Sequence, residues 1–311
     1  MDELSHLLRK RARWTWRRLQ DAHSVPDLGY SHIREDGFTN FNLLYLRVHA
    51  PKGLRIELFK GDDEQSTGAD WEWWFIGAGG SALGFRVQAK VINDRRTGYD
   101  HLHHFKEPTG PYQVERLIED AARGPYRKIP AYCLYTHWIG GRKSAAPGWD
   151  ANLKPSDYGC AWLDADYVHS NREKSETRTL SHLFSRLRPW HCLFTNPAIA
   201  AMDLPERVLS GWNNAFRREP AKPIPSDIIH PEMPDWLWRL RKFKERDQAA
   251  RSLDTSKRSD PQSIGADITP LSAIDELVGL SGVVVFQEDE TYKQNQLFSM
   301  PPEPPIPPPE W

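Results

Sequence analysis

The sequence predicts an α/β fold in which helices flank a mixed β-sheet. Residues 70–76 and 84–92 have the aromatic and β-branched content of strands, and the glycine-rich residues 77–81 between them suit a hairpin turn. An amphipathic helical pattern over residues 112–122 then leads to an apolar strand at 130–135. Since a helical crossover joins parallel strands and a hairpin joins antiparallel ones, the two together predict a mixed sheet.

The first twenty residues predict a helix with a strong local charge. Six basic residues against two acidic ones give this stretch a net charge of about +4. Two interpretations are open. The helix could present a solvated face while Trp14 and Trp16 pack on the body of the protein, or it could contact phosphate groups through Arg17 and Arg18.

One further helix and one strand are expected before the hairpin. Residues 29–50 place apolar side chains at helical spacing, and residues 54–60 alternate apolar and polar side chains as a short strand does. A cap within residues 39–42 could instead begin a helix there, which would put Glu35 on a short helix before it.

The C-terminal half predicts fewer regular elements. Residues 159–169 fit either a strand or a helix. The other expected elements are helices at 177–188, 203–216 and 236–251 and strands at 190–194 and 282–287. The final eleven residues are mostly proline, so we expect a polyproline II character and no packed structure there.

Composition excludes some classes of protein and leaves others open. The 311 residues carry 41 Lys and Arg against 42 Asp and Glu, which excludes a histone-like polycation. A nucleic-acid partner stays open because a neutral chain can still segregate its charges. No apolar run approaches a membrane-spanning length and no signal-peptide pattern opens the chain, so no membrane association is expected. With only 3 Cys and no CxxC pair, we expect a cytoplasmic protein without a disulfide framework or zinc ribbon.

The second and third strands carry the residues with the most chemical information. Asp70 opens the second strand, while Gln88 and Lys90 leave the same face of the third, and a tight hairpin brings Asp70 near Gln88. Oxygens from Asp70, Gln88 and the backbone carbonyl of Ala89 suit Mg²⁺ or Mn²⁺, and Glu35 could complete the site directly or through water. Lys90 could orient or help deprotonate the attacking water, so the set suits phosphodiester hydrolysis.

A resemblance appears in these residues. GADWEWW followed by VQAK, within the order helix–strand–strand–strand–helix–strand, resembles the restriction-endonuclease-like superfamily of PD-(D/E)XK nucleases. It looks most like the Mrr-like branch, in which the E-x-K element is Q-x-K. The resemblance covers roughly residues 29–137 and implies Asp70 as metal ligand, Gln88 and Lys90 as the Q-x-K pair, and Glu35 as the helix carboxylate. The combination is also similar to a bacterial family that we expect in genomic islands and phage-defence settings.

The resemblance suggests a division of the chain into four parts. We expect a basic N-terminal helix at residues 1–28, a nuclease-like core at 29–140, a C-terminal α/β extension with proline-rich connectors at 141–290, and a disordered proline-rich tail at 291–311.

Three neighbouring polar residues are further candidates. Glu64 lies in the loop before Asp70 and could supply a third carboxylate. Glu72 shares the face of Asp70, so it is either a second ligand or outer acid, or an ordinary cross-strand partner of Arg86. Gln113 opens the following helix and either reaches the site or a phosphate, or lies on a solvated surface.

A histidine-rich loop, YDHLHHF, follows the third strand. His103 and His104 are adjacent, which is poor geometry for one zinc ion on a regular element. Two interpretations remain for this loop, a contact with the nucleic-acid backbone or a plain polar connection.

The expected function is metal-dependent hydrolysis of nucleic acid, with DNA favoured, in a protein that could act as a defence effector. Arg241 and Lys242, on the second basic-aromatic helix, are additional candidate contacts to nucleic acid. The alternative is a catalytically inactive nucleic-acid-binding or scaffold protein, because Gln88 stands where related motifs carry an acid. A protein partner or a homo-oligomer is compatible with either.

Overall fold

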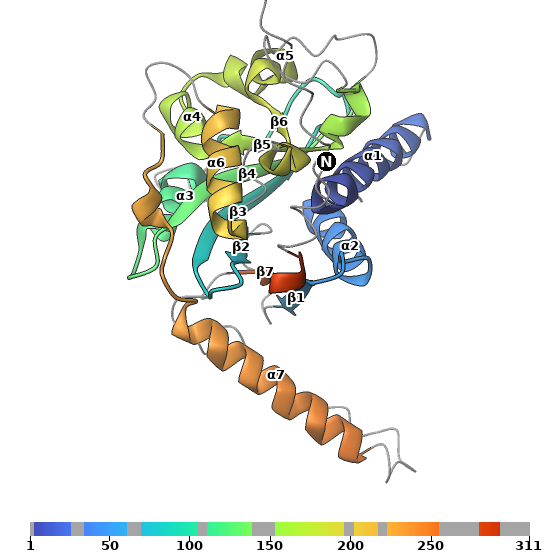
Figure 1. Ribbon diagram of the computed structural model, residues 1–311. Coiled ribbons are helices and arrows are strands. Elements are labelled where there is room, and N and C mark those ends of the chain that lie inside the picture. The colour runs from blue at the N-terminus through green and yellow to red at the C-terminus, as the bar shows by residue number, and fades with distance from the viewer. Residues whose placement is uncertain are drawn as a thin grey trace, which may run out of the picture.

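In the computed structural model, the chain forms a mixed sheet with helices on both faces (Figure 1). The structure describes residues 3–25, 34–60, 70–104, 111–138, 153–195, 202–216, 223–254 and 280–292. Within these ranges the α/β class expected from the sequence is confirmed.

The described strands form one seven-stranded sheet in the order β1-β7-β2-β3-β4-β5-β6. The strands are β1 (Leu54–Lys60), β2 (Asp70–Ile76), β3 (Ala82–Val91), β4 (Lys128–Tyr135), β5 (Cys160–Asp164), β6 (Arg188–Pro189) and β7 (Gly282–Glu288). The hairpin β2–β3 is antiparallel, whereas β3 and β4 are parallel, as the predicted crossover requires. From the C-terminal end of the chain, β7 enters between β1 and β2, parallel to β2 and antiparallel to β1.

The glycine-rich turn of the β2–β3 hairpin needs a conformation that favours glycine. Gly80 has φ +92°, in the left-handed region, and its amide donates to the carbonyl of Gly77. The amide of Gly77 in turn donates to the carbonyl of Ser81 at 2.9 Å. This closure holds the two strands in a single register, in which Trp73 pairs with Phe85.

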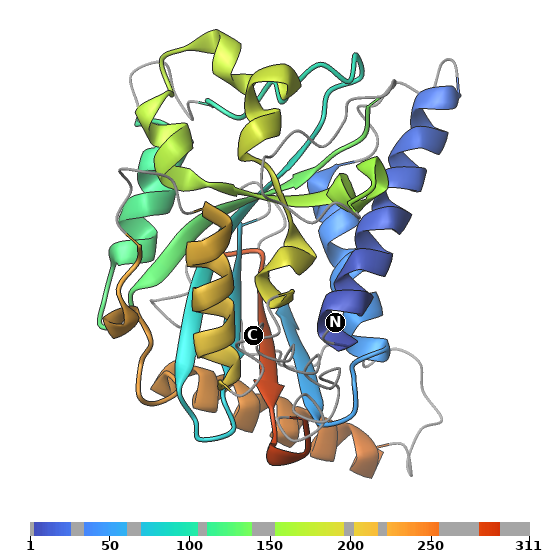
Figure 2. The ribbon, with the colours of Figure 1, turned by 45° about the horizontal axis from the view of Figure 1, so that its top comes forward.

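Three of the described helices cover one face of the sheet and four lie on the other. The helices are α1 (Glu3–Ser24), α2 (Glu35–Val48), α3 (Gln113–Ala122), α4 (Ala165–Ser170), α5 (Leu180–Leu183), α6 (Leu204–Phe216) and α7 (Asp235–Asp254). Apolar residues of α1, α2 and α6 share one core cluster with Trp71, Trp73 and Phe75 of β2. On the opposite face, α3 packs near β4, and α7 packs on the β2–β7 side, with the rings of Trp74 and Trp236 5.6 Å apart. In Figure 2, α6 lies in front of the sheet and α7 behind it.

Buried ion pairs attach two of these helices to the sheet. Arg241 of α7 donates to Glu57 of β1 at 2.5 Å, and Arg207 of α6 donates to Glu288 of β7 at 2.6 Å. All four residues are buried, so each charge has its counter-ion within the protein.

The strands of the central hairpin and the helix that follows them agree with the prediction from the sequence. Several elements predicted in the C-terminal half need correction. The expected strand at residues 190–194 is wrong: Trp190–Phe194 forms a 3₁₀ helix. Its aromatic residues favour a strand only in a suitable context, and here the indole of Trp190 is buried and donates to the carbonyl of Leu8 at 2.6 Å.

Two more stretches differ from the expected pattern. Residues 177–188 do not form one helix, because the hydroxyls of Thr177 and Thr179 bond to nearby backbone carbonyls and break the segment into short turns. Residues 159–169 form a strand followed by a helix, and Asp164 caps that helix by accepting from the amide of Asp166.

Strands β5, β6 and β7, from the residues expected to form an extension at 141–290, lie in the same sheet as the strands of the expected core at 29–140. The predicted tail at 291–311 lies outside the described residues from position 293 onward. Nowhere in the described ranges is a helix both long and apolar enough to cross a membrane.

Candidate active site

The register of the central hairpin aligns the residues of the sequence motif. Asp70 pairs directly with Gln88, as the hairpin predicted, and Lys90 follows two positions later on β3. Paired residues of antiparallel strands share a face, as do residues two apart on one strand. Positions 70, 88 and 90 therefore lie on one face of the sheet, although the side chain of Asp70 is outside the described part.

Gln88 is a buried amide without a described hydrogen-bond partner. Its side chain is 0 % exposed, and neither Oε1 nor Nε2 has a partner. An unpaired amide in the interior costs free energy, since water no longer solvates it. Such a residue is explained most simply by a group that is brought to it, which makes Gln88 the central residue of the candidate site.

Lys90 is the second member of the site whose side chain the structure describes. Its ammonium donates to Oε1 of Gln113 at 2.7 Å, and the side chain is buried. Gln113 opens α3, where its own amide donates to the carbonyl of His104 and Glu115 accepts from the amide of Tyr112. The start of α3 thus positions Gln113, and of the two interpretations of this residue, the structure favours contact with the site.

The end of β3 extends past the first residue of β2. Asp70 is the first residue of β2, so no described residue of β2 pairs with Ala89, Lys90 or Val91. On its other side β3 stays paired with β4 through Val91 and Tyr135.

In the histidine loop expected from the sequence, His104 lies within electrostatic reach of Lys90. The side chain of His104 is largely exposed. Its pKa is lowered, first because part of the ring is removed from water and then by the charges of Lys90 and His101. His103 instead contacts the hydroxyl of Thr177 at 2.9 Å. The two adjacent histidines have separate surroundings, which agrees with the weak prospect of a shared zinc ion.

Glu35 occupies a different position from the one that a compact site needs. It begins α2, on the face of the sheet opposite Gln88 and Lys90, and it is half-buried. One turn later, Thr39 bonds to the hydroxyl of Tyr135 at 2.7 Å, which places the first turn of α2 near the end of β4. No described contact joins Glu35 to Gln88 or Lys90. Glu64 lies outside the described residues.

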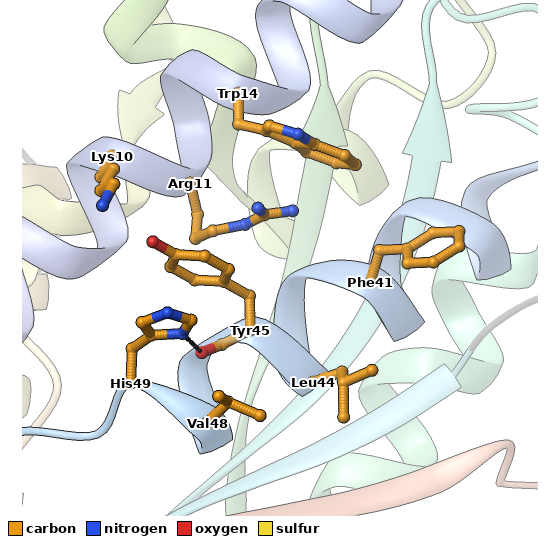
Figure 3. Close-up of a pocket in the computed structure, with 8 residues that line it drawn as sticks. All are labelled: Lys10, Arg11, Trp14, Phe41, Leu44, Tyr45, Val48 and His49. Atoms are coloured by element: carbon orange, nitrogen blue, oxygen red, sulfur yellow. Dashed lines mark hydrogen bonds between the residues drawn. The ribbon is translucent and has the colours of Figure 1, made fainter.

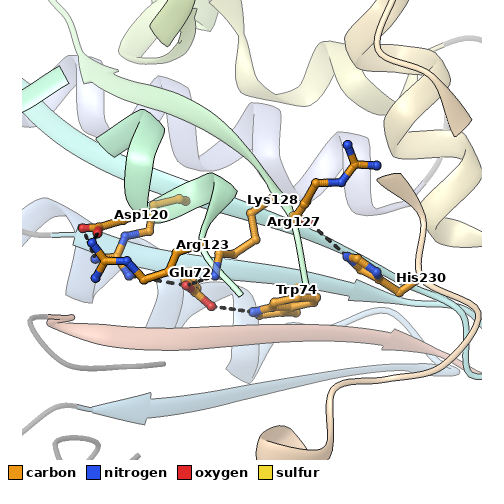
Figure 4. Close-up of polar contacts among 8 residues, drawn as sticks. Glu72, Trp74, Asp120, Arg123, Arg127, Lys128 and His230 are labelled. Carbon is orange, nitrogen blue, oxygen red and sulfur yellow. Dashed lines mark hydrogen bonds and ion pairs between the residues drawn. The ribbon is translucent and has the colours of Figure 1, made fainter. Parts of the chain in front are cut away.

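Glu72 belongs to a paired network rather than to a ligand set (Figure 4). Its carboxylate is 0 % exposed and accepts from Trp74 at 2.9 Å, from Lys128 at 3.0 Å and from Arg86 at 3.3 Å. The alternative of a cross-strand partner to Arg86 is confirmed. With three donors on two oxygens, Glu72 has little capacity left for a cation.

The predicted nucleic-acid contacts divide into exposed and buried residues. Arg17 and Arg18 are exposed on α1, and Arg18 also pairs with Asp21 at 3.3 Å. Lys242 is exposed on α7. Arg241 corrects the expectation, because it is buried against Glu57 and faces the sheet.

The donors present fit an oxygen-loving cation only in part. Within the described ranges, no group of three or more His, Cys, Asp or Glu could hold a metal ion. The orphaned amide oxygen of Gln88 is nevertheless a suitable ligand atom, and it pairs in register with an aspartate. A cation at this place would depend on Asp70, Gln88 and backbone oxygens such as that of Ala89.

The fold and this cluster define an α/β protein with a buried polar site on one face of its central hairpin. Within that class, the chain belongs to DUF6615, described as a family of unknown function, whose model matches residues 4–292. No curated protein and no solved structure matches the chain.

Proposed function

We propose that the chain is a metal-dependent nuclease that hydrolyses phosphodiester bonds, with DNA as the favoured substrate. The observation that carries the proposal is the orphaned amide of Gln88, opposite Asp70 in register and on the same face as Lys90. The element order α2-β1-β2-β3-α3-β4 supports a restriction-endonuclease-like core, into which β7 would be an insertion between β1 and β2.

Each residue has a role in the proposed reaction. Asp70, Oε1 of Gln88 and the carbonyl of Ala89 would hold Mg²⁺ or Mn²⁺, without the carboxylate of Glu35, which starts on the opposite face of the sheet. Such a cation supplies Lewis-acid activation of water and of the scissile phosphate. The ammonium of Lys90 would stabilise the negative charge that develops on the phosphate. Gln113 is a positioning residue, because its hydrogen bond fixes the amine of Lys90.

The proposal places the protein in the cytoplasm and gives it a nucleic-acid surface. Cys133 and Cys160 are buried and form no disulfide, which suits a reducing compartment. The exposed bases Arg17, Arg18 and Lys242 are the candidates for phosphate contact.

A second candidate function is a nucleic-acid-binding or scaffold protein that keeps this fold without turnover. Two features favour it: Gln88 contributes a neutral oxygen where a carboxylate would be charged, and Glu35 starts on the opposite face of the sheet. The two functions differ in turnover and agree in binding.

Cleavage assays on the full chain separate these functions. Wild-type protein should nick plasmid DNA with Mg²⁺ or Mn²⁺ and stop with chelator. Asp70→Asn and Lys90→Met should each reduce cleavage by about 10³-fold, because each removes a group from the reacting centre. The matched controls Asp166→Asn and Lys174→Met change exposed residues outside the hairpin and should cleave normally.

The outcomes that contradict the proposal are specific. Circular dichroism first shows that the variants are folded. If either folded site variant still cleaves DNA, the proposed active site is wrong. DNA binding by fluorescence anisotropy without any turnover by the wild type would favour the scaffold function. The same assays on RNA determine which nucleic acid is the substrate.

A further inference from the structure

An apolar groove lies between α1 and α2, away from the candidate active site. Figure 3 shows its lining residues, with α2 contributing Phe41, Leu44 and Val48. These three side chains are 63 %, 52 % and 68 % exposed, and they recur at helical spacing along one face of α2. Exposed apolar side chains of this size, gathered in one row, commonly mark a binding surface.

Aromatic rings and cations form the rest of the groove. Trp14 of α1 lies with its ring centroid 6.4 Å from that of Phe41, and the ring of His49 stacks on Tyr45 at 3.9 Å. The guanidinium of Arg11 lies 3.8 Å from the ring centroid of Trp14 and 4.5 Å from that of Tyr45. Lys10 also lines the groove, so the surface is aromatic and positively charged together.

The chain itself carries a segment with complementary chemistry. Residues 301–310 read PPEPPIPPPE, with Glu303 and Glu310 as the charged residues and no basic residue after Lys293. Proline-rich segments favour the polyproline II conformation and bind grooves lined by aromatic rings. The segment lies outside the described residues, so its sequence and its point of departure are the basis of the argument.

That point of departure is close to the groove. The amide of Asp289 donates to the carbonyl of Gly53 at 2.9 Å, and a side chain at Gly53 would lie only 2.6 Å from the backbone nitrogen of Tyr292. Val48 precedes Gly53 by five residues, which span at most about 18 Å. The eight residues between Tyr292 and the first proline can span about 26 Å, so the proline segment can reach the groove.

The lengths of the two surfaces agree as well. The apolar row from Phe41 to Val48 is about 10 Å long along the helix axis. A polyproline II segment rises about 3.1 Å per residue, so three or four residues would cover the row. Glutamates at the margins of such a segment could then approach the exposed ammonium of Lys10.

From this complementarity we infer that the groove between α1 and α2 binds residues 301–310 of the same chain. The inference is independent of the proposed nuclease activity, because no residue of the hairpin site takes part. It assigns the groove to an intramolecular ligand of acidic, proline-rich character.

Photo-crosslinking of the full chain tests the inference. We replace Val48 with p-benzoylphenylalanine, irradiate the protein and identify the linked peptides by mass spectrometry. The experiment uses an equal mixture of heavy- and light-isotope protein, so that links within one chain can be told from links between two chains. The expected product has monomer mass and joins position 48 to residues 301–310 of the same chain. The same replacement at Trp238, which is 53 % exposed on α7, is the control and should not link to this segment.

Two variants sharpen the result. Glu303→Gln combined with Glu310→Gln should lower the crosslink yield by about fivefold, because the segment loses its attraction to the exposed ammonium of Lys10. Phe41→Ser combined with Leu44→Ser should abolish it, while circular dichroism remains that of the wild type because both residues are exposed.

Several results would overturn the inference. These are links between heavy and light chains, links to α1 or α2 of a second copy, equal links to the tail from the α7 control, or no link at all. The first two would identify the groove as an interface between copies of the chain. A crosslink yield unchanged by both double variants would equally contradict binding through these residues.

Discussion

Two polar groups lie side by side on one face of the central hairpin, and they differ in how their hydrogen bonds are satisfied. The pair Glu72 and Arg86 is surrounded by partners from β2, β3 and β4, so its buried charges are compensated. One step along the ladder, Gln88 is equally buried, but neither of its amide atoms has a partner among the described residues. The two groups share strands, burial and face, whereas the carboxylate of Glu72 accepts from three donors and the neutral amide of Gln88 has no described bond.

The contrast teaches that burial of a polar residue does not by itself indicate a functional site. A paired buried charge contributes to a unique packing of the sheet and is costly to disturb. An unpaired buried amide costs free energy in the folded protein, and a protein retains such a group where it serves another purpose. Substitutions at the two positions should therefore have opposite effects on stability.

The largest effect is expected at Glu72. Glu72→Gln would leave Lys128 and most of the charge of Arg86 uncompensated in the interior, so it should lower the free energy of unfolding by about 3–5 kcal/mol. Urea denaturation followed by tryptophan fluorescence measures this. The control is Asp120→Asn, whose carboxylate lies 3.7 Å from Arg86 and is partly exposed, so that change should cost less than about 1 kcal/mol. Equal losses in the two variants would contradict the comparison.

A smaller effect of opposite sign is expected at Gln88. Gln88→Met removes both unpaired amide atoms at similar volume, so it should raise the free energy of unfolding by about 1 kcal/mol while cleavage is lost. Asn42 provides the matched control, because this buried amide is bonded to Arg11 and Thr15, and Asn42→Leu should destabilise the protein. A destabilised Gln88→Met variant would show that the amide has a structural partner.

The charge at position 88 gives a second measurement. Gln88→Glu should preserve cleavage and lower the Mg²⁺ concentration required, since a carboxylate binds the cation more strongly than an amide. Metal titrations that superimpose for wild type and Gln88→Glu would remove this residue from the ligand set.

The smallest effect on stability is expected for exposed basic residues, which contrast with a basic residue that is buried in an ion pair. Arg17→Glu combined with Arg18→Glu changes exposed side chains, so it should reduce the slope of log affinity against log salt by about 2 for DNA, with little change in stability. Arg241→Gln breaks a buried pair with Glu57, so it should lower the stability of the protein and leave the salt dependence of DNA binding unchanged. Anisotropy titrations across salt concentrations decide this, and a slope unchanged by the first variant would assign α1 to another role.

The local part of the fold could be predicted from the sequence. Glycines at residues 77–81 between two β-prone runs determine the hairpin, so the pairing of Asp70 with Gln88 followed from short-range chemistry. The pairing of Glu72 with Arg86 could be named as an alternative for the same reason. Lys128, its other partner, comes from β4 and became visible only when the strands were placed in order.

Long-range packing accounts for what the sequence could not predict. The aromatic residues of Trp190–Phe194 suit a strand locally, but contact with α1 places them in a 3₁₀ helix. Arg241 has the composition of a phosphate-binding helix around it, yet burial against β1 decides its role. The groove between α1 and α2 likewise depends on how two distant helices pack.

The position of β7 has a consequence for the order in which the protein can form during synthesis. Leu54 pairs with Glu288 and Trp71 pairs with Gly282, so two strands from the first quarter of the chain wait for a strand made near its end. Until β7 emerges from the ribosome, the facing edges of β1 and β2 lack their partner and can pair with strands of other molecules. Contacts across more than two hundred residues also make assembly slow. A nascent chain that stops before residue 282 should therefore be prone to aggregation, and Asp70 would have no completed sheet around it.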